Sequence, residues 1–170
     1  MRSSPTVGAN KQHRSALWAV LVGGSIAGTL DILFAISFAA YDGVPPARLL
    51  QTVASGLLGK AAFSGGVPTA ALGLFLHFAM SYTWTGIFLV AARRLPGLVR
   101  RPVLSGILFG IVVFFSMRLI VLPLSAFPYP VTFKALATVL DLLSHTFLFG
   151  VPIALTARRA CADTGPQPDQ

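Results

Sequence analysis

Four long apolar runs dominate the chain and are separated by short polar stretches. They cover residues 16–41, 67–92, 103–126 and 135–157. Each is longer than the roughly 20 residues that a helix needs to span the hydrocarbon core. None alternates apolar and polar residues with the period of two that is typical of a barrel strand. Because a helix satisfies its own backbone hydrogen bonds in lipid, the pattern predicts an all-α fold, an integral membrane four-helix bundle.

The transmembrane domain is expected to cover residues 16–160, between two short tails. Residues 1–15 and 161–170 contain many Ser, Pro, Gln and Asp residues and are predicted to be disordered cytoplasmic tails. A cleaved signal peptide is the alternative interpretation of the first run. It is disfavoured because the apolar part of such a peptide usually covers only about 7–15 residues.

Residues 44–66 link the first two runs and are too polar to cross the membrane. Leu50, Val53 and Leu57 recur at helical spacing, whereas polar residues such as Arg48 and Lys60 fall on other faces. This pattern predicts an amphipathic helix on the outer interface. A re-entrant lid over a cavity is the alternative.

The composition agrees with a membrane protein and indicates its orientation. Charged residues make up 11% of the chain, against roughly 25% in soluble domains. Of the 13 Lys and Arg residues, nine lie before the first run, in the loop after the second run or directly after the fourth run, and three lie on the opposite side. The positive-inside rule therefore places both termini in the cytoplasm. The net charge of +8 then reflects orientation and attraction to anionic headgroups, and we expect no nucleic-acid partner.

Five ionisable side chains interrupt the apolar runs: Asp31, His77, Arg118, Asp141 and His145. With a rise of 1.5 Å per residue and alternating chain direction, all five fall in one shallow layer, with His145 close to the bilayer centre and the other four on its outer side. Each formal charge costs about 2.5–3.5 kcal/mol at a helix centre, so we expect them to meet inside the bundle as a buried polar layer. With Arg118 between two carboxylates and both His residues neutral, the layer carries a net charge of −1 that one proton or cation balances.

Small and polar residues on the same helical faces support this layer. Two G-x-x-x-G pairs are expected to bring helices close together: Gly24 and Gly28, Gly106 and Gly110. A polar stripe follows four-residue steps through His77 on the second run, with the supporting residues Thr69, Ser81 and Thr85. The sequence thus predicts both the packing faces and the face that carries the ionisable groups.

Several of these features occur together in a known family. They are His77, Leu95-Pro96, Gly106 and Gly110, Leu122-Pro123-Leu124, and the carboxylate three residues before Ser144-His145. In these features, over about half of its length, the chain resembles the YagU-type family of small bacterial inner-membrane proteins. Members of that family are regarded as uncharacterised multi-pass membrane proteins. The resemblance therefore implies a bacterial inner membrane and supplies no reaction.

We expect no enzymatic activity, no cofactor and no metal, and we interpret the polar layer as structural or as a binding site. The lipid bilayer is the expected partner, and a homo-oligomer is left open. A small proton-linked or solute transporter, or a channel subunit, is the alternative function, and at this size it would require a homodimer. A haem or quinone-linked redox protein is the second alternative, with His77 and His145 as axial haem ligands. Catalysis by Ser144 is disfavoured because neighbours on one helix point about 100° apart.

Overall fold

The computed structural model describes residues 5–162, with side chains described from Ala16 onward. This part of the chain is helical and contains no strand. Four helices are long and apolar enough to cross a membrane, over residues 16–41, 66–94, 102–124 and 135–162. The predicted all-α fold with four spans is confirmed, and it fits a multi-pass membrane protein.

The described residues form four long rods joined by three shorter connections. The first rod is α1 (Pro5–Tyr41). The short α2 (Pro46–Leu58) and the 3₁₀ turn η1 (Gly59–Ser64) connect it to the second rod, α3 (Gly66–Arg94), and the short α4 (Gly97–Arg100) follows. The third rod is α5 (Pro102–Ser116), η2 (Met117–Val121) and α6 (Leu122–Leu124), and the fourth is α7 (Ala135–Leu143), η3 (Ser144–Gly150) and α8 (Val151–Ala162). Both η2 and η3 are π-helical and lie within otherwise α-helical rods.

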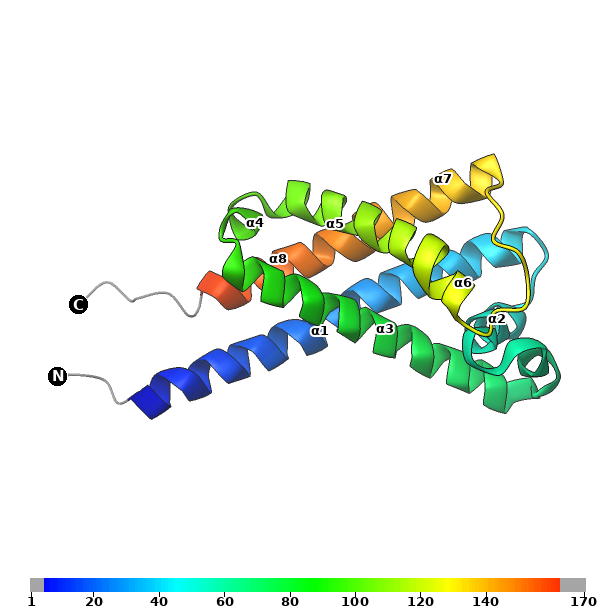
Figure 1. Cartoon of the computed structure of the whole chain (residues 1–170), viewed down its shortest axis with the longest axis horizontal. Helices are drawn as coiled ribbons and strands as arrows, with labels where there is room; N and C mark the ends of the chain where they lie inside the picture. Colours follow the sequence, from blue (N-terminus) through cyan, green and yellow to red (C-terminus); the bar gives the residue numbers. More distant parts are fainter. Residues whose placement is uncertain (1–4, 163–170) are drawn as a thin grey trace.

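The chain direction gives the molecule two different ends (Figure 1). One end, which we call the tail end, holds the beginning of α1, the loop with α4 and the end of α8. The opposite end, the α2 end, holds α2, η1 and the segment between α6 and α7. The basic loop at residues 93–101 therefore lies at the same end as both described ends of the chain, as the sequence predicts.

The first helix begins earlier than its apolar run. The structure differs from the predicted disorder of residues 5–15 because α1 starts at Pro5 and is helical through this segment. Extending an existing helix requires no new nucleus, and proline is well accepted in a first turn. Residues 1–4 and 163–170, which belong to the predicted tails, lie outside the described residues.

Tight packing of small residues joins the rods in the half toward the tail end. A Cβ atom at Gly106 would lie 2.6 Å from the Cα of Val151, and one at Gly110 would collide with the backbone of His145. On α1, Gly24 and Gly28 lie directly against the rings of Tyr82 and Phe78 of α3. All four predicted packing glycines are therefore at close helix contacts.

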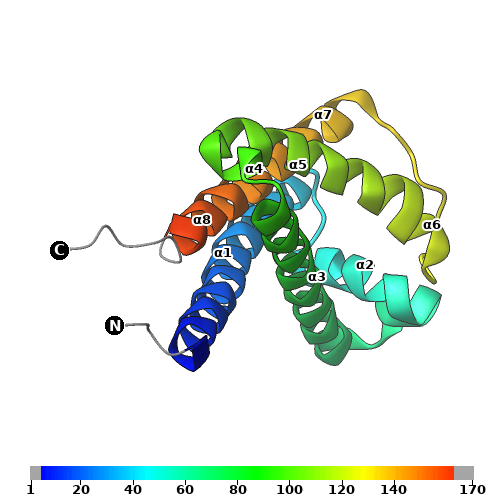
Figure 2. The same ribbon diagram turned by 60° about the vertical axis from the view of Figure 1, so that its left-hand side comes forward.

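The rods separate in the half toward the α2 end. Near the tail end α3 and α5 are joined by the Phe88 and Phe109 rings, whose centroids are 4.9 Å apart. Figure 2 shows that α3 and the α5–α6 rod then diverge and that α2 lies between them. The buried face of α2 contains Gln51, Ala54 and Ser55, and the Gln51 amide donates a hydrogen bond to the Gly66 carbonyl at 3.0 Å.

A helix forms between the first two spans, as predicted, and the face that it buries in the protein contains polar residues. Its polar Gln51 and Ser55 are buried, whereas the apolar Leu57 is 61% exposed. Gly73 of α3 allows this contact, because a Cβ atom there would collide with the Leu50 carbonyl group. The helix ends at Gly59, with φ +57°, and not at Gly65-Gly66, because glycine adopts this left-handed conformation without strain.

Candidate functional site

Arg118 of η2 and Asp141 of α7 form an ion pair between the third and fourth rods. The Nη2 and Nε atoms of Arg118 lie 2.8 and 3.1 Å from Oδ2 of Asp141. The remaining guanidinium nitrogen, Nη1, donates to the Thr132 carbonyl at 2.8 Å. All three nitrogens of Arg118 are thus engaged, and the pair fixes the segment between α6 and α7 against both rods.

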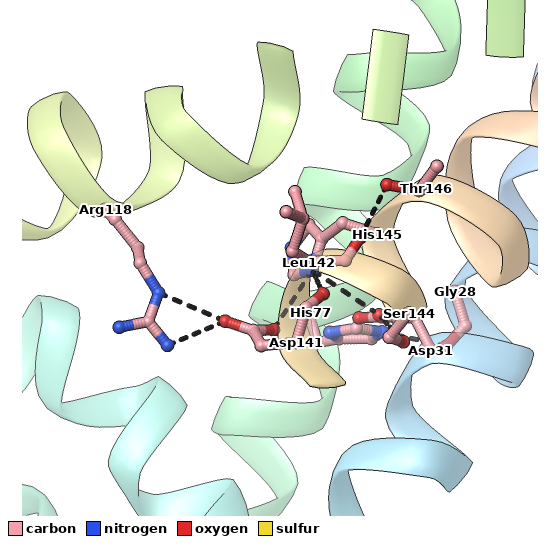
Figure 3. Close-up of polar contacts among 9 residues, drawn as sticks. All are labelled: Gly28, Asp31, His77, Arg118, Asp141, Leu142, Ser144, His145 and Thr146. Carbon is pink, nitrogen blue, oxygen red and sulfur yellow. Dashed lines mark hydrogen bonds and ion pairs between the residues drawn. The ribbon is translucent and has the colours of Figure 1, made fainter. Parts of the chain in front are cut away.

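His145 of η3 lies between two carboxylates (Figure 3). Its Nδ1 atom is 3.1 Å from Oδ1 of Asp141 and 3.9 Å from Oδ1 of Asp31. The same nitrogen lies 3.0 Å from the Asp141 carbonyl oxygen. Because a carbonyl oxygen only accepts, Nδ1 carries the hydrogen and donates it on this side of the ring.

Asp31 of α1 is held by a residue that the sequence analysis did not assign to the polar layer. The Ser144 hydroxyl donates to Oδ1 of Asp31 at 2.7 Å, so α1 and η3 are joined directly. Since the hydroxyl donates to this carboxylate and not to His145, Ser144 is not arranged as a nucleophile with a histidine base. Its position one residue before His145 is the sequence signal that could have identified it.

Four of the five predicted ionisable residues are joined in this way, with one difference in pairing. Arg118 was expected between both carboxylates, but it contacts Asp141, while Asp31 contacts Ser144 and His145. The reason is that the three guanidinium nitrogens of Arg118 bond to Asp141 and to the Thr132 carbonyl, which leaves none of them bonded to Asp31. The four side chains are 13–34% exposed, because they line open space instead of a closed core.

His77 and the polar stripe of α3 bond mainly to backbone groups. The Nε2 atom of His77 donates to the Gly28 carbonyl at 2.9 Å, and the Ser81 hydroxyl donates to the Gly24 carbonyl at 2.7 Å. Thr85 donates to the Ser81 carbonyl, and Thr69 donates to the Ala62 carbonyl. The stripe therefore holds α3 against the glycine face of α1 and holds η1 against α3.

His77, the fifth predicted ionisable residue, lines a cavity of about 430 Å³ together with the other four. All five predicted ionisable residues line it: Asp31, His77, Arg118, Asp141 and His145. A second cavity of about 350 Å³ is also lined by Asp31, Arg118 and Asp141, and it extends along α1 to Asp42. The two cavities thus share the charged groups and reach the α2 end by different routes, one beside Asp42 and one beside the segment 127–134.

Both π-helical turns lie at this site, and each is followed by a proline. Arg118 lies in η2 and His145 is the second residue of η3. Pro123 and Pro152 come two residues after the respective turns. A proline lacks the N–H group for the helical bond and its ring crowds the carbonyl four residues earlier. A wider turn accommodates both effects, and π-turns are frequent at functional sites. Pro123 and Pro152, inside the third and fourth apolar runs, are the sequence signal for these turns.

Comparisons with known proteins found no relative of this chain. No family model, no curated protein and no solved structure matches the chain. The resemblance to the YagU-type family therefore stays a prediction from the sequence.

Proposed function

We propose that the protein binds a small polar solute in the cavity between its four spans and does not catalyse a reaction on it. The observation that carries this proposal is that five ionisable side chains from all four spans line one cavity of about 430 Å³. A network that only held the helices together would be expected to close around its charges, because packed interiors leave few voids. Small-molecule sites typically measure about 300–1,000 Å³ and combine apolar walls with a few polar groups.

We also propose that the protein resides in a bacterial inner membrane with both termini in the cytoplasm. Basic residues at the tail end support this orientation: Arg93, Arg94, Arg100, Arg101, Arg158 and Arg159. The α2 end carries Arg48, Lys60 and Lys134. In this orientation both cavities open toward the periplasm. Reporter fusions at each terminus should be active only as cytoplasmic reporters, and a periplasmic C-terminus would contradict the orientation.

The binding proposal can be tested with a panel of probes of four chemical kinds. The melting temperature of the purified protein in detergent would be measured with small organic ammonium ions, zwitterions, carboxylates and neutral polyols. A ligand at 100 times its Kd stabilises the folded state by about 2.7 kcal/mol, so at least one kind of probe should raise the melting temperature by several degrees.

A filled cavity provides the control. Ala137 lines both cavities, so Ala137→Phe should abolish the ligand-induced shift. Ala135 lies on the same helix and is exposed, so Ala135→Phe should leave the shift intact. If no probe stabilises the unmodified protein, or if both variants respond equally, the solute does not bind in this cavity.

A further inference from the structure

The charges of the site do not balance without an additional occupant. Asp31 and Asp141 supply two carboxylates, and Arg118 supplies one permanent positive charge. Arg118 is fully engaged by Asp141 and by the Thr132 carbonyl. Within the described chain, the ion pair of Asp31 is the 3.9 Å contact with His145. The counter-charge of Asp31 therefore has to come from a protonated His145 or from a bound cation.

Two occupants can supply the missing charge. One is a proton on His145, whose Nδ1 lies between Asp141 and Asp31. The other is a cation placed in the cavity beside Asp31. Because an uncompensated charge away from water is costly, the site favours having one of these occupants over having none.

The other titratable groups around the cavity are less suited to this role. His77 on α3 donates its Nε2 hydrogen to the Gly28 carbonyl, which is uncharged. Lys134 lines the cavity from the segment before α7, where its residue is exposed at the α2 end. Its ammonium group can therefore reach water, whereas Asp31 lies within the first span.

The cavity walls indicate which cation would fit. Beside the charges they are formed by aromatic and thioether side chains, including Phe114, Phe127, Met80 and Met117. Such surfaces favour an organic cation through cation–π and sulfur contacts. A hydrated metal ion instead needs several oxygen ligands, and the described residues contain no cluster of three or more His, Cys, Asp or Glu that could hold one.

We propose, building on the proposed solute binding, that the ligand is a small organic ammonium ion that pairs with Asp31 and displaces the proton of His145. The ammonium ion enters from the α2 end and places its positive charge beside the Asp31 carboxylate. His145 then releases its additional proton to solvent, so that one positive charge replaces another. Ligand and proton occupy the site alternately.

Isothermal titration calorimetry with benzyltrimethylammonium tests this exchange on the full-length protein in detergent. This probe is permanently charged and cannot titrate, so any proton released comes from the protein. Titrations at neutral pH in two buffers with different ionisation enthalpies should show one binding site and the release of up to one proton per probe. The difference in apparent enthalpy between the buffers measures that release.

Three variants locate the charge and the proton. Asp31→Asn keeps an oxygen that accepts from Ser144 but removes the charge, so it should weaken binding by about tenfold or more. Ser37→Ala, at an exposed position of the same helix that lines neither cavity and whose hydroxyl bonds to the Leu33 carbonyl, should bind as the unmodified protein does. His145→Gln should retain binding but release no proton.

Each other result overturns a defined part of the proposal. If benzyltrimethylammonium does not bind while a zwitterion or a carboxylate stabilises the protein, solute binding stands and the cationic ligand is wrong. If no probe of any kind binds, both proposals fail. Unchanged binding in Asp31→Asn refutes the assigned counter-charge, and binding without proton release refutes the exchange with His145.

Discussion

The half of the molecule toward the tail end and the half toward the α2 end use the same four rods in opposite ways. In the first half small side chains are fully enclosed, with Ala154 at 0% and Ala157 at 1% exposure. In the second half the charged side chains remain 13–34% exposed around two cavities. Helix packing at one end of the bundle therefore holds the rods together, and the other end can accommodate charged side chains and cavities.

The two halves contain different sequence features. Toward the tail end, glycines let the backbones of α5 and η3 touch, and apolar side chains such as Phe88 and Ile153 fill the remaining volume. Toward the α2 end, the third and fourth rods contain the π-turns η2 and η3, and each turn is followed by a proline. We therefore make separate predictions for helix packing, for charge pairing and for the access of reagents to each half.

The largest effect is expected from adding one methyl group where the backbones of two rods touch. Gly110→Ala would place a Cβ atom 2.6 Å from the Cα of Thr146, and a backbone cannot move aside as a flexible side chain can. We expect the free energy of unfolding to fall by about 3 kcal/mol, measured by denaturant titration in mixed micelles. Gly86→Ala is the matched control, because nothing lies within 4 Å of its added Cβ atom. Equal destabilisation by both variants would mean that this crossing does not hold the bundle together.

Removing the permanent positive charge should have the next largest effect. Arg118→Leu leaves Asp141 without its partner, and we expect a loss of about 2 kcal/mol, below the roughly 3–5 kcal/mol of a fully buried pair because this pair is partly exposed. Adding Asp141→Asn should recover part of the loss, whereas adding Asp31→Asn should recover less. A double-mutant cycle from denaturant titrations measures this coupling. If the stability changes of Arg118→Leu and Asp141→Asn simply add in the double variant, the ion pair contributes nothing to the free energy of unfolding.

A smaller effect is expected from the hydrogen bond between the first and fourth rods. Ser144→Ala removes the donor to Asp31 and should lower the free energy of unfolding by about 1 kcal/mol. Ser37→Ala on α1 is the control, because that exposed hydroxyl bonds only to the Leu33 carbonyl one turn earlier. The control should change stability by less than about 0.5 kcal/mol. A loss in Ser37→Ala as large as that in Ser144→Ala would remove the special role of Ser144.

Cysteine accessibility should distinguish the two halves with the least disturbance of stability. In a Cys161→Ser background, Ala137→Cys lines both cavities and should react readily with a small charged thiol reagent. Ala154→Cys in the enclosed half should react only on unfolding. Both variants add one sulfur atom to an alanine, so we expect melting temperatures near that of the background protein. Comparable labelling rates at both positions would mean that the two halves do not differ in access.

The sequence by itself determined the class of fold and the positions of its spans. Runs of more than 20 apolar residues have few structural solutions in lipid, so length and hydropathy alone predict four helices to within a few residues at most ends. The glycine pairs also identified contact faces correctly, because small residues at four-residue spacing lie on one side of a helix. From rise per residue and chain direction the sequence predicted one depth for the five ionisable residues, and the structure places all five around one cavity.

Only the tertiary structure decided which of these groups touch and what lies between them. Depth says nothing about rotation or separation of helices, so the pairing of Arg118 with Asp141 and the contact of Ser144 with Asp31 depend on how the rods cross. The burial of the polar face of α2 likewise depends on Gly73 of another helix. The cavities arise because α3 and α5 diverge, and that divergence results from packing between rods distant in sequence, which no local pattern encodes.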